Sequence, residues 1–111
     1  MSLGPSCLII GAGMAGLTAG GALPARGWDA ALLDKGRGVG GRMTTRRMGK
    51  SRFDHGAQFL TLRDMRFQEA VKRWQSLNWV VPWFGEGGHV RYRALGGMNA
   101  LAKHLGAALD F

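Results

Sequence analysis

Three glycines near the start of the chain follow a pattern that can cradle phosphate: Gly11-Ala12-Gly13-Met14-Ala15-Gly16. An apolar run before it predicts a buried strand over 6–10, and an Ala-, Leu- and Met-rich run after it predicts a helix over 14–26. The first glycine permits a tight turn, the second lets a pyrophosphate approach the backbone, and the third lets the helix pack closely on the sheet. Because a helix N-terminus also offers free N–H groups, this context predicts a dinucleotide-binding turn.

An acidic residue ends the next apolar run, which predicts a second strand over 28–33. Asp34 follows Gly16 by eighteen residues, close to the separation of about 20 at which a carboxylate accepts hydrogen bonds from a ribose. The alternative is a tight turn without ligand, with Asp34 as a surface acid. Strand, helix and strand together form a βαβ unit and predict an α/β fold.

A second glycine cluster follows directly, in a segment over 35–52 that holds seven basic residues, five glycines and no acidic residue. This composition predicts a loop. Gly40 and Gly41 can present backbone N–H groups to phosphate, and Arg42 adds a fork of donors. A nicotinamide-binding fold would place another helix here, so the cluster favours FAD over NAD.

The order of these motifs resembles the flavin-containing amine oxidase superfamily, over residues 6–16, 33–48 and 53–59. Within it, the segments 34–47 and Asp54-His55-Gly56-Ala57-Gln58-Phe59 resemble the bacterial renalase-like FAD-dependent oxidoreductases. Gly97-Met98-Asn99-Ala100-Leu101-Ala102 is similar to that family's Gly-Met-x-x-Leu segment. The resemblance covers nearly the whole chain.

This resemblance implies a Rossmann-like domain that binds FAD noncovalently and acts as an oxidoreductase. It implies that flavin removes hydride from a dihydronicotinamide or an amine, a small-molecule substrate, and that oxygen is the acceptor. It assigns no catalytic residue. Asp34 would hold the adenosine ribose, and Gly56, Ala57 and Gln58 would lie near the isoalloxazine ring. The expected cofactor-binding residues are Gly11, Gly13, Ala15, Gly16, Asp34, Lys35, Gly40, Gly41, Arg42, Met43, Gly56, Ala57 and Gln58.

Proteins of this family are several times longer than the 111 residues here. We therefore expect residues 1–60 to form the FAD-binding βαβ unit with its Gly-Gly-Arg loop. Residues 61–111 would begin the substrate domain and rejoin the FAD domain, leaving the fold truncated. An alternative function follows, a catalytically incomplete FAD-binding fragment. A sheet that lacks strands exposes apolar surface and edges, which favours a homo-oligomer.

The rest of the chain predicts alternating strands and helices. Apolar patterning indicates a strand over 53–61, a helix over 64–77 capped by Thr61 or Asp64, and a last helix over 97–109. Two further strands are expected around a glycine-rich turn, over 79–84 and 89–93.

Charge and composition bear on the other classes of function that the chain could have. The net charge of +8 permits a nucleic-acid binder, but the basic residues surround glycines and no known nucleic-acid motif is present, so no specific nucleic acid is expected. A single cysteine, Cys7, excludes an internal disulfide, and the histidine spacing matches no zinc site, so no metal is expected. Weak hydropathy and the absence of a signal peptide predict a soluble cytoplasmic protein without membrane insertion.

Two groups of residues have both a chemical and a structural interpretation. Asp54 and His55 could form an acid–base pair, but neighbours on a strand point to opposite faces, which favours a structural role. Trp74, Trp79 and Trp83 could form an aromatic cage for a cation, whereas core packing is the ordinary role of such residues.

Overall fold

The computed structural model describes residues 4–36 and 38–109, and these divide into two compact units. The first unit comprises the described residues up to Arg42 and from Ala102 onward, and the second is Met43–Leu101. Packing therefore separates the chain after Arg42, whereas the sequence suggested a division after residue 60. The division after residue 60 separated a cofactor-binding part from a substrate-binding part, and this assignment of roles stays a prediction.

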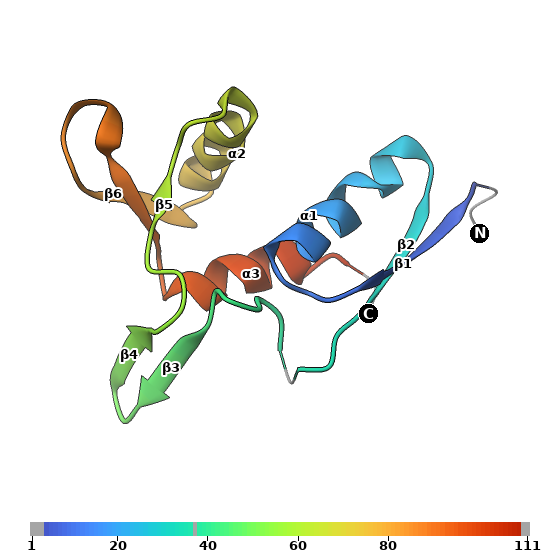
Figure 1. The fold of residues 1–111 in the computed structure, drawn as a ribbon, viewed down its shortest axis with the longest axis horizontal. Coiled ribbons are helices and arrows are strands. Elements are labelled where there is room, and N and C mark those ends of the chain that lie inside the picture. Colours follow the sequence, from blue (N-terminus) through green and yellow to red (C-terminus); the bar gives the residue numbers. More distant parts are fainter. Residues whose placement is uncertain (1–3, 37, 110–111) are drawn as a thin grey trace. The chain divides into compact units, whose positions relative to one another are not determined.

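The first unit is built on the predicted βαβ motif. Strand β1 (Ser6–Ile10) and strand β2 (Asp29–Leu33) pair in parallel, and helix α1 (Met14–Ala22) connects them (Figure 1). Ser6 lies opposite Asp29, and Ile10 lies opposite Leu33. The unit has the predicted Rossmann-like α/β fold.

Helix α1 ends irregularly, as its glycines and proline predict. After Ala22 the chain forms a short 3₁₀ turn, η1 (Pro24–Arg26), which ends at Gly27 with a φ of 84°. Proline cannot donate a helical hydrogen bond, and glycine adopts this left-handed conformation without strain. The turn lets the chain reverse into β2.

The two faces of the β1–β2 pair differ in exposure. A Cβ atom built on Gly16 of α1 would lie 3.4 Å from the Ile9 side chain, so Ile9 faces the helix. Leu8, Ile10 and Leu33 remain 62%, 73% and 58% exposed. The prediction of a fully buried strand was therefore wrong, because α1 covers only one face.

The second unit begins with a hairpin where the sequence predicted a loop. Strands β3 (Thr45–Met48) and β4 (Ser51–Asp54) pair antiparallel, with Met48 opposite Ser51. Only two residues join them, and the first, Gly49, has a φ of 61°, which suits a tight hairpin turn. The loop prediction is confirmed for the described residues of 35–44, which form no helix or strand, and was wrong over 45–52. A hairpin is possible there because the arginines of these strands stay exposed, as charged side chains do on a solvated sheet face.

A three-stranded antiparallel sheet follows, in the order β5–β7–β6. Its strands are β5 (Leu60–Thr61), β6 (Val80–Phe84) and β7 (Arg91–Ala94). The strand predicted over 53–61 was wrong between β4 and β5, where residues 55–59 form no regular structure. His89 lies in a 3₁₀ turn, η2 (Gly87–His89), and not in the predicted strand.

Helix α2 (Met65–Ser76) packs against β6 and supplies much of the core of this unit. Val71 and Trp74 of the helix and Val80 of β6 are buried, and the Trp74 ring meets Phe67 edge-on at 5.9 Å. The final helix α3 (Met98–Gly106) is shorter at both ends than the sequence predicted.

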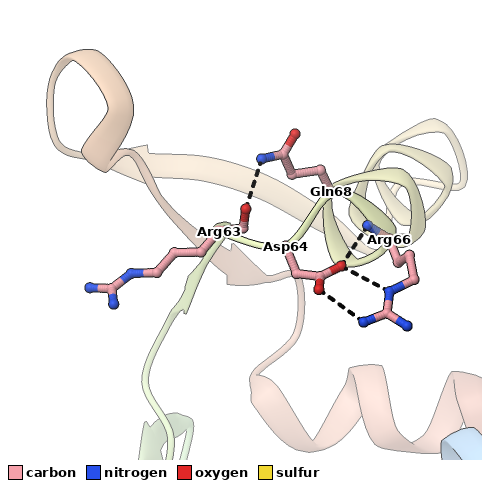
Figure 2. Close-up of polar contacts among 4 residues, drawn as sticks. All are labelled: Arg63, Asp64, Arg66 and Gln68. Carbon is pink, nitrogen blue, oxygen red and sulfur yellow. Dashed lines mark hydrogen bonds and ion pairs between the residues drawn. The ribbon is translucent and has the colours of Figure 1, made fainter.

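Asp64 caps α2, as one of the two predicted caps. Its Oδ1 accepts hydrogen bonds from the backbone N–H of Arg66 at 2.8 Å and from Arg66 Nε at 3.2 Å. Its Oδ2 lies 3.0 Å from Arg66 Nη2, in an exposed ion pair (Figure 2). The hydrogen bond from the Arg66 side chain, with that from its backbone, lowers the pKa of Asp64 from 3.8 to about 2.

This cap predicts a pH-dependent contribution to stability. The folded-state pKa is depressed, so the stabilisation is complete above about pH 4 and is lost as the pH falls towards 2. We expect Asp64→Asn to lower the melting temperature at neutral pH, and the difference from the wild type to shrink across that window. Thermal unfolding followed by circular dichroism measures both.

Glu69→Gln is the matched control, because it removes a carboxylate from the same helix without touching the cap. An equal loss in both variants would show that net charge, and not the cap, stabilises the protein.

Candidate dinucleotide-binding site

The turn between β1 and α1 is fixed by backbone packing. Gly11 has a φ of 106°, and its N–H donates a hydrogen bond to the carbonyl oxygen of Leu33 at 2.7 Å. A Cβ atom on Gly16 would overlap the carbonyl oxygen of Gly11. The first and third glycines of the motif thus permit the tight turn and the close approach of helix to strand.

The N-terminus of α1 has backbone donors that the helix itself does not use, and there is free space beside Gly13. The first hydrogen bond of the helix runs from the N–H of Leu17 to the carbonyl oxygen of Gly13 at 2.9 Å. The N–H groups of Met14, Ala15 and Gly16 precede it, so the helix itself does not use them. No atom lies within 4 Å of a Cβ built on Gly13. The turn therefore offers donors, a favourable dipole and room to an anion.

Asp34 connects the two loops that follow β1 and β2. Its Oδ1 accepts a hydrogen bond from the N–H of Ala12 at 3.1 Å, and its Oδ2 accepts one from the N–H of Gly36 at 3.0 Å. The carboxylate is partly buried and lies beside the glycine turn. Each oxygen has a second lone pair that a hydroxyl donor can use. Lys35 is exposed beside it, and Arg37 lies outside the described residues.

The second glycine cluster lies directly against the first. The N–H of Gly40 donates to the carbonyl oxygen of Ala12 at 2.7 Å, and Gly40 forms a parallel bridge with Gly13. Gly40 and Gly41 have φ values of 121° and 55°, and a Cβ on Gly41 would lie 3.3 Å from Gly13 Cα. Only glycine fits both constraints. The first unit thus brings the two predicted phosphate-binding segments together.

Arg42 completes this cluster as an exposed side chain, without a hydrogen bond or ion pair within the described part of the chain. Its guanidinium group can therefore turn to an anionic ligand without breaking a contact. The sequence predicted this role for it.

The remaining predicted site residues belong to the second unit. Met43 is buried, and Gly56, Ala57 and Gln58 lie in the irregular segment after β4. Gln58 Nε2 donates a 3.4 Å hydrogen bond to the carbonyl oxygen of Asp54. The predicted place of this segment beside a flavin ring stays a prediction.

Asp54 has a structural role that sequence reasoning identified only in part. Its Oδ1 accepts hydrogen bonds from Thr45 Oγ1 at 2.6 Å and from the N–H of Met98 at 2.9 Å. Thr45 Oγ1 in turn accepts one from the N–H of Asn99 at 3.0 Å. The hairpin β3–β4 therefore caps α3. Two glycines precede that helix, and the missing local cap was a signal that a distant side chain supplies one.

The other chemical alternatives receive little support from the described residues. His55 is exposed, Trp74 is buried against Phe67, and Trp83 is 51% exposed against Phe84. The packing of Trp74 is thus structural, as the sequence favoured. In residues 4–36 and 38–109, no three His, Cys, Asp or Glu side chains are grouped to hold a metal. No helix in these ranges is long and apolar enough to cross a membrane.

Comparison with known proteins agrees with this geometry. Residues 9–74 match the family described as NAD(P)-binding Rossmann-like domain. A solved structure of a CLA-producing fatty acid isomerase from P. acnes is similar, with 33% sequence identity and a TM-score of 0.52. The match covers 61% of this chain but only 16% of the isomerase chain.

The packing of Gly16 predicts a sharp difference between two glycines of α1. Gly16→Ala forces a Cβ atom into the Gly11 carbonyl, and overpacking of this kind costs about 1–3 kcal/mol of unfolding free energy. Gly21→Ala makes the same chemical change where no atom lies within 4 Å, and should stabilise the helix by about 0.5–1 kcal/mol. Urea denaturation measures both. Equal effects would contradict the proposed packing role.

Proposed function

The chain belongs to the NAD(P)-binding Rossmann-like domain family, and on this basis we propose that it is the FAD-binding part of an oxidoreductase. The observation that carries the choice of FAD is the contact between the two glycine clusters, in which Gly40 bonds to Ala12 and Gly41 lies against Gly13. After β2, none of the described residues 34–36 and 38–44 is helical. The backbone of a second loop takes that place, and it would give the diphosphate of FAD a second row of contacts.

The predicted site residues would then have separate roles toward the cofactor. The N-terminus of α1 with Gly13 and Ala15 would bind the pyrophosphate, and Asp34 would accept hydrogen bonds from the adenosine ribose. Gly40, Gly41 and Arg42 would cover the diphosphate from the other side, with Lys35 and Met43 beside them. Gly56, Ala57 and Gln58 would lie by the ring. Bound flavin would supply the hydride acceptor.

The substrate belongs to the same proposal. The motifs that resemble renalase-like oxidoreductases support a dihydronicotinamide or an amine as hydride donor, with oxygen as acceptor. Anaerobic mixing of the FAD-loaded protein with NADH, its isomers or simple amines tests this, because hydride transfer bleaches the flavin absorbance. No bleaching with any donor would favour the alternative, a catalytically incomplete FAD-binding fragment.

The similarity to a fatty acid isomerase favours a second candidate reaction, the isomerisation of an unsaturated fatty acid. It would move a double bond without net consumption of oxygen. Formation of a conjugated diene from linoleate, measured by ultraviolet absorbance beside an oxygen electrode, separates the two reactions. A cytoplasmic location and a homo-oligomer stay predictions, which fractionation and sedimentation would check.

The free space at Gly13 predicts a variant that separates binding from folding. Gly13→Ala clashes with nothing in the protein, and its φ of −78° suits any residue. The methyl group would occupy the place proposed for the pyrophosphate. We expect unchanged unfolding and an FAD affinity at least about tenfold weaker, or about 1.4 kcal/mol. Flavin fluorescence titration measures the affinity, and Gly21→Ala is the control. Unweakened binding would contradict the pyrophosphate site.

The position of Asp34 predicts a second effect on FAD affinity. Asp34→Ala should weaken binding by about 1–3 kcal/mol through the lost ribose hydrogen bond. Asp29→Ala removes the same charge at the other end of β2 and should leave the affinity unchanged. A similar loss in both variants would show a general charge effect, and an unchanged affinity in Asp34→Ala would refute the ribose role.

A further inference from the structure

The second unit contains a pocket of about 260 Å³ that the cofactor proposal does not explain. Three secondary-structure elements supply the side chains that matter: Arg52 from β4, Trp83 from β6 and Arg93 from β7. Gln58 and Asp54 also line it. The volume is below the range of about 300–1,000 Å³ for drug-sized ligands, so it suits a single ring with one substituent.

The charge of this pocket favours an anion. Arg52 and Arg93 contribute two guanidinium groups against the one carboxylate of Asp54, whose Oδ1 already accepts hydrogen bonds from Thr45 and Met98. The Arg93 side chain makes no hydrogen bond or ion pair within the described residues. A free guanidinium fork matches the two oxygens of a carboxylate.

The neighbourhood of Arg52 adds to the positive charge. Arg52 lies directly opposite Arg47 in the β3–β4 hairpin. Like charges opposite each other on a sheet are destabilising, and an anion held between arginines relieves that repulsion. Arg52 Nη1 makes one 3.3 Å contact with the carbonyl oxygen of Gly96. Its other donors remain for a ligand.

Trp83 gives the pocket a flat apolar surface. The β6–β7 register shifts between Pro82 and Phe84, which places Trp83 at a β-bulge. Bulges redirect a side chain and are frequent beside functional sites. The Phe84 ring meets the Trp83 ring edge-on at 4.8 Å, and Trp83 nevertheless stays 51% exposed. About half of the Trp83 surface is thus accessible to a ligand.

We propose that this pocket binds an aromatic carboxylate, with the carboxylate on Arg93 and Arg52 and the ring against Trp83. Its lining residues all belong to the second unit, so the proposal stands without bound FAD. Gln58 lies in the segment proposed above to flank the flavin ring. If that proposal holds, and on that basis alone, the hydride donor is an amine that also carries an aromatic carboxylate.

Benzoate is the probe, with benzamide as its neutral counterpart and acetate as the anion without a ring. Each is titrated into the FAD-free protein while the indole N–H resonances are followed by NMR, and the Trp83→Phe spectrum assigns the Trp83 signal. We expect benzoate to shift that signal and to bind at least about tenfold more tightly than benzamide or acetate, the scale of one charge-assisted contact. Equal affinity for benzamide or for acetate would overturn the proposal.

Two arginine variants test the site itself. Arg93→Gln should weaken benzoate binding at least about tenfold, whereas Arg46→Gln, an equal change on the hairpin outside the pocket, should leave it unchanged. Matching backbone spectra for the variants exclude unfolding. Equal losses in both variants would show only general attraction to a basic protein. Because no FAD is present, neither result depends on the cofactor proposal.

Discussion

The close approach of backbone to backbone around Gly13 is the constraint on which the first unit depends. Gly16 lets α1 lie against the Gly11 carbonyl, and Gly41 lets the second loop lie against Gly13 Cα. Any larger residue at these contacts would separate helix from strand or loop from loop. The same packing leaves open space beside Gly13 at the start of α1. The stability of the turn and its capacity to bind phosphate therefore come from one arrangement.

The second unit depends on a different interaction, the shared carboxylate of Asp54. One oxygen accepts from the Thr45 hydroxyl and from the start of α3, so it joins a hairpin to a helix more than forty residues away in sequence. Gly97 has no side chain because Thr45 and Asp54 occupy that space. This explains why an acidic residue beside a histidine is structural here. It also leaves Arg52 and Arg93, on the nearby strands, without a fully available counterion.

The sequence predicted the parts of the fold in which one local rule decides the structure. Glycine spacing identified the turn after β1, Pro24 and Gly27 the end of α1, and Asp64 the cap of α2. The sequence-based prediction failed where the structure depends on how two segments pair. The arginines over 45–52 suggested a loop, yet the Gly49 turn and an exposed face allow a hairpin. The cap of α3 comes from distant residues, and the bulge at Trp83 depends on register with β7, so neither could be found from local patterns.

Three of the cations that contribute to the net charge of +8 lie at the two proposed binding sites. Arg42 lies at the dinucleotide turn, where a diphosphate would neutralise it. Arg52 and Arg93 line a pocket of the second unit, beside a carboxylate that is already engaged. The cations at these two sites would then serve the small anionic ligands proposed above, a dinucleotide and a carboxylate.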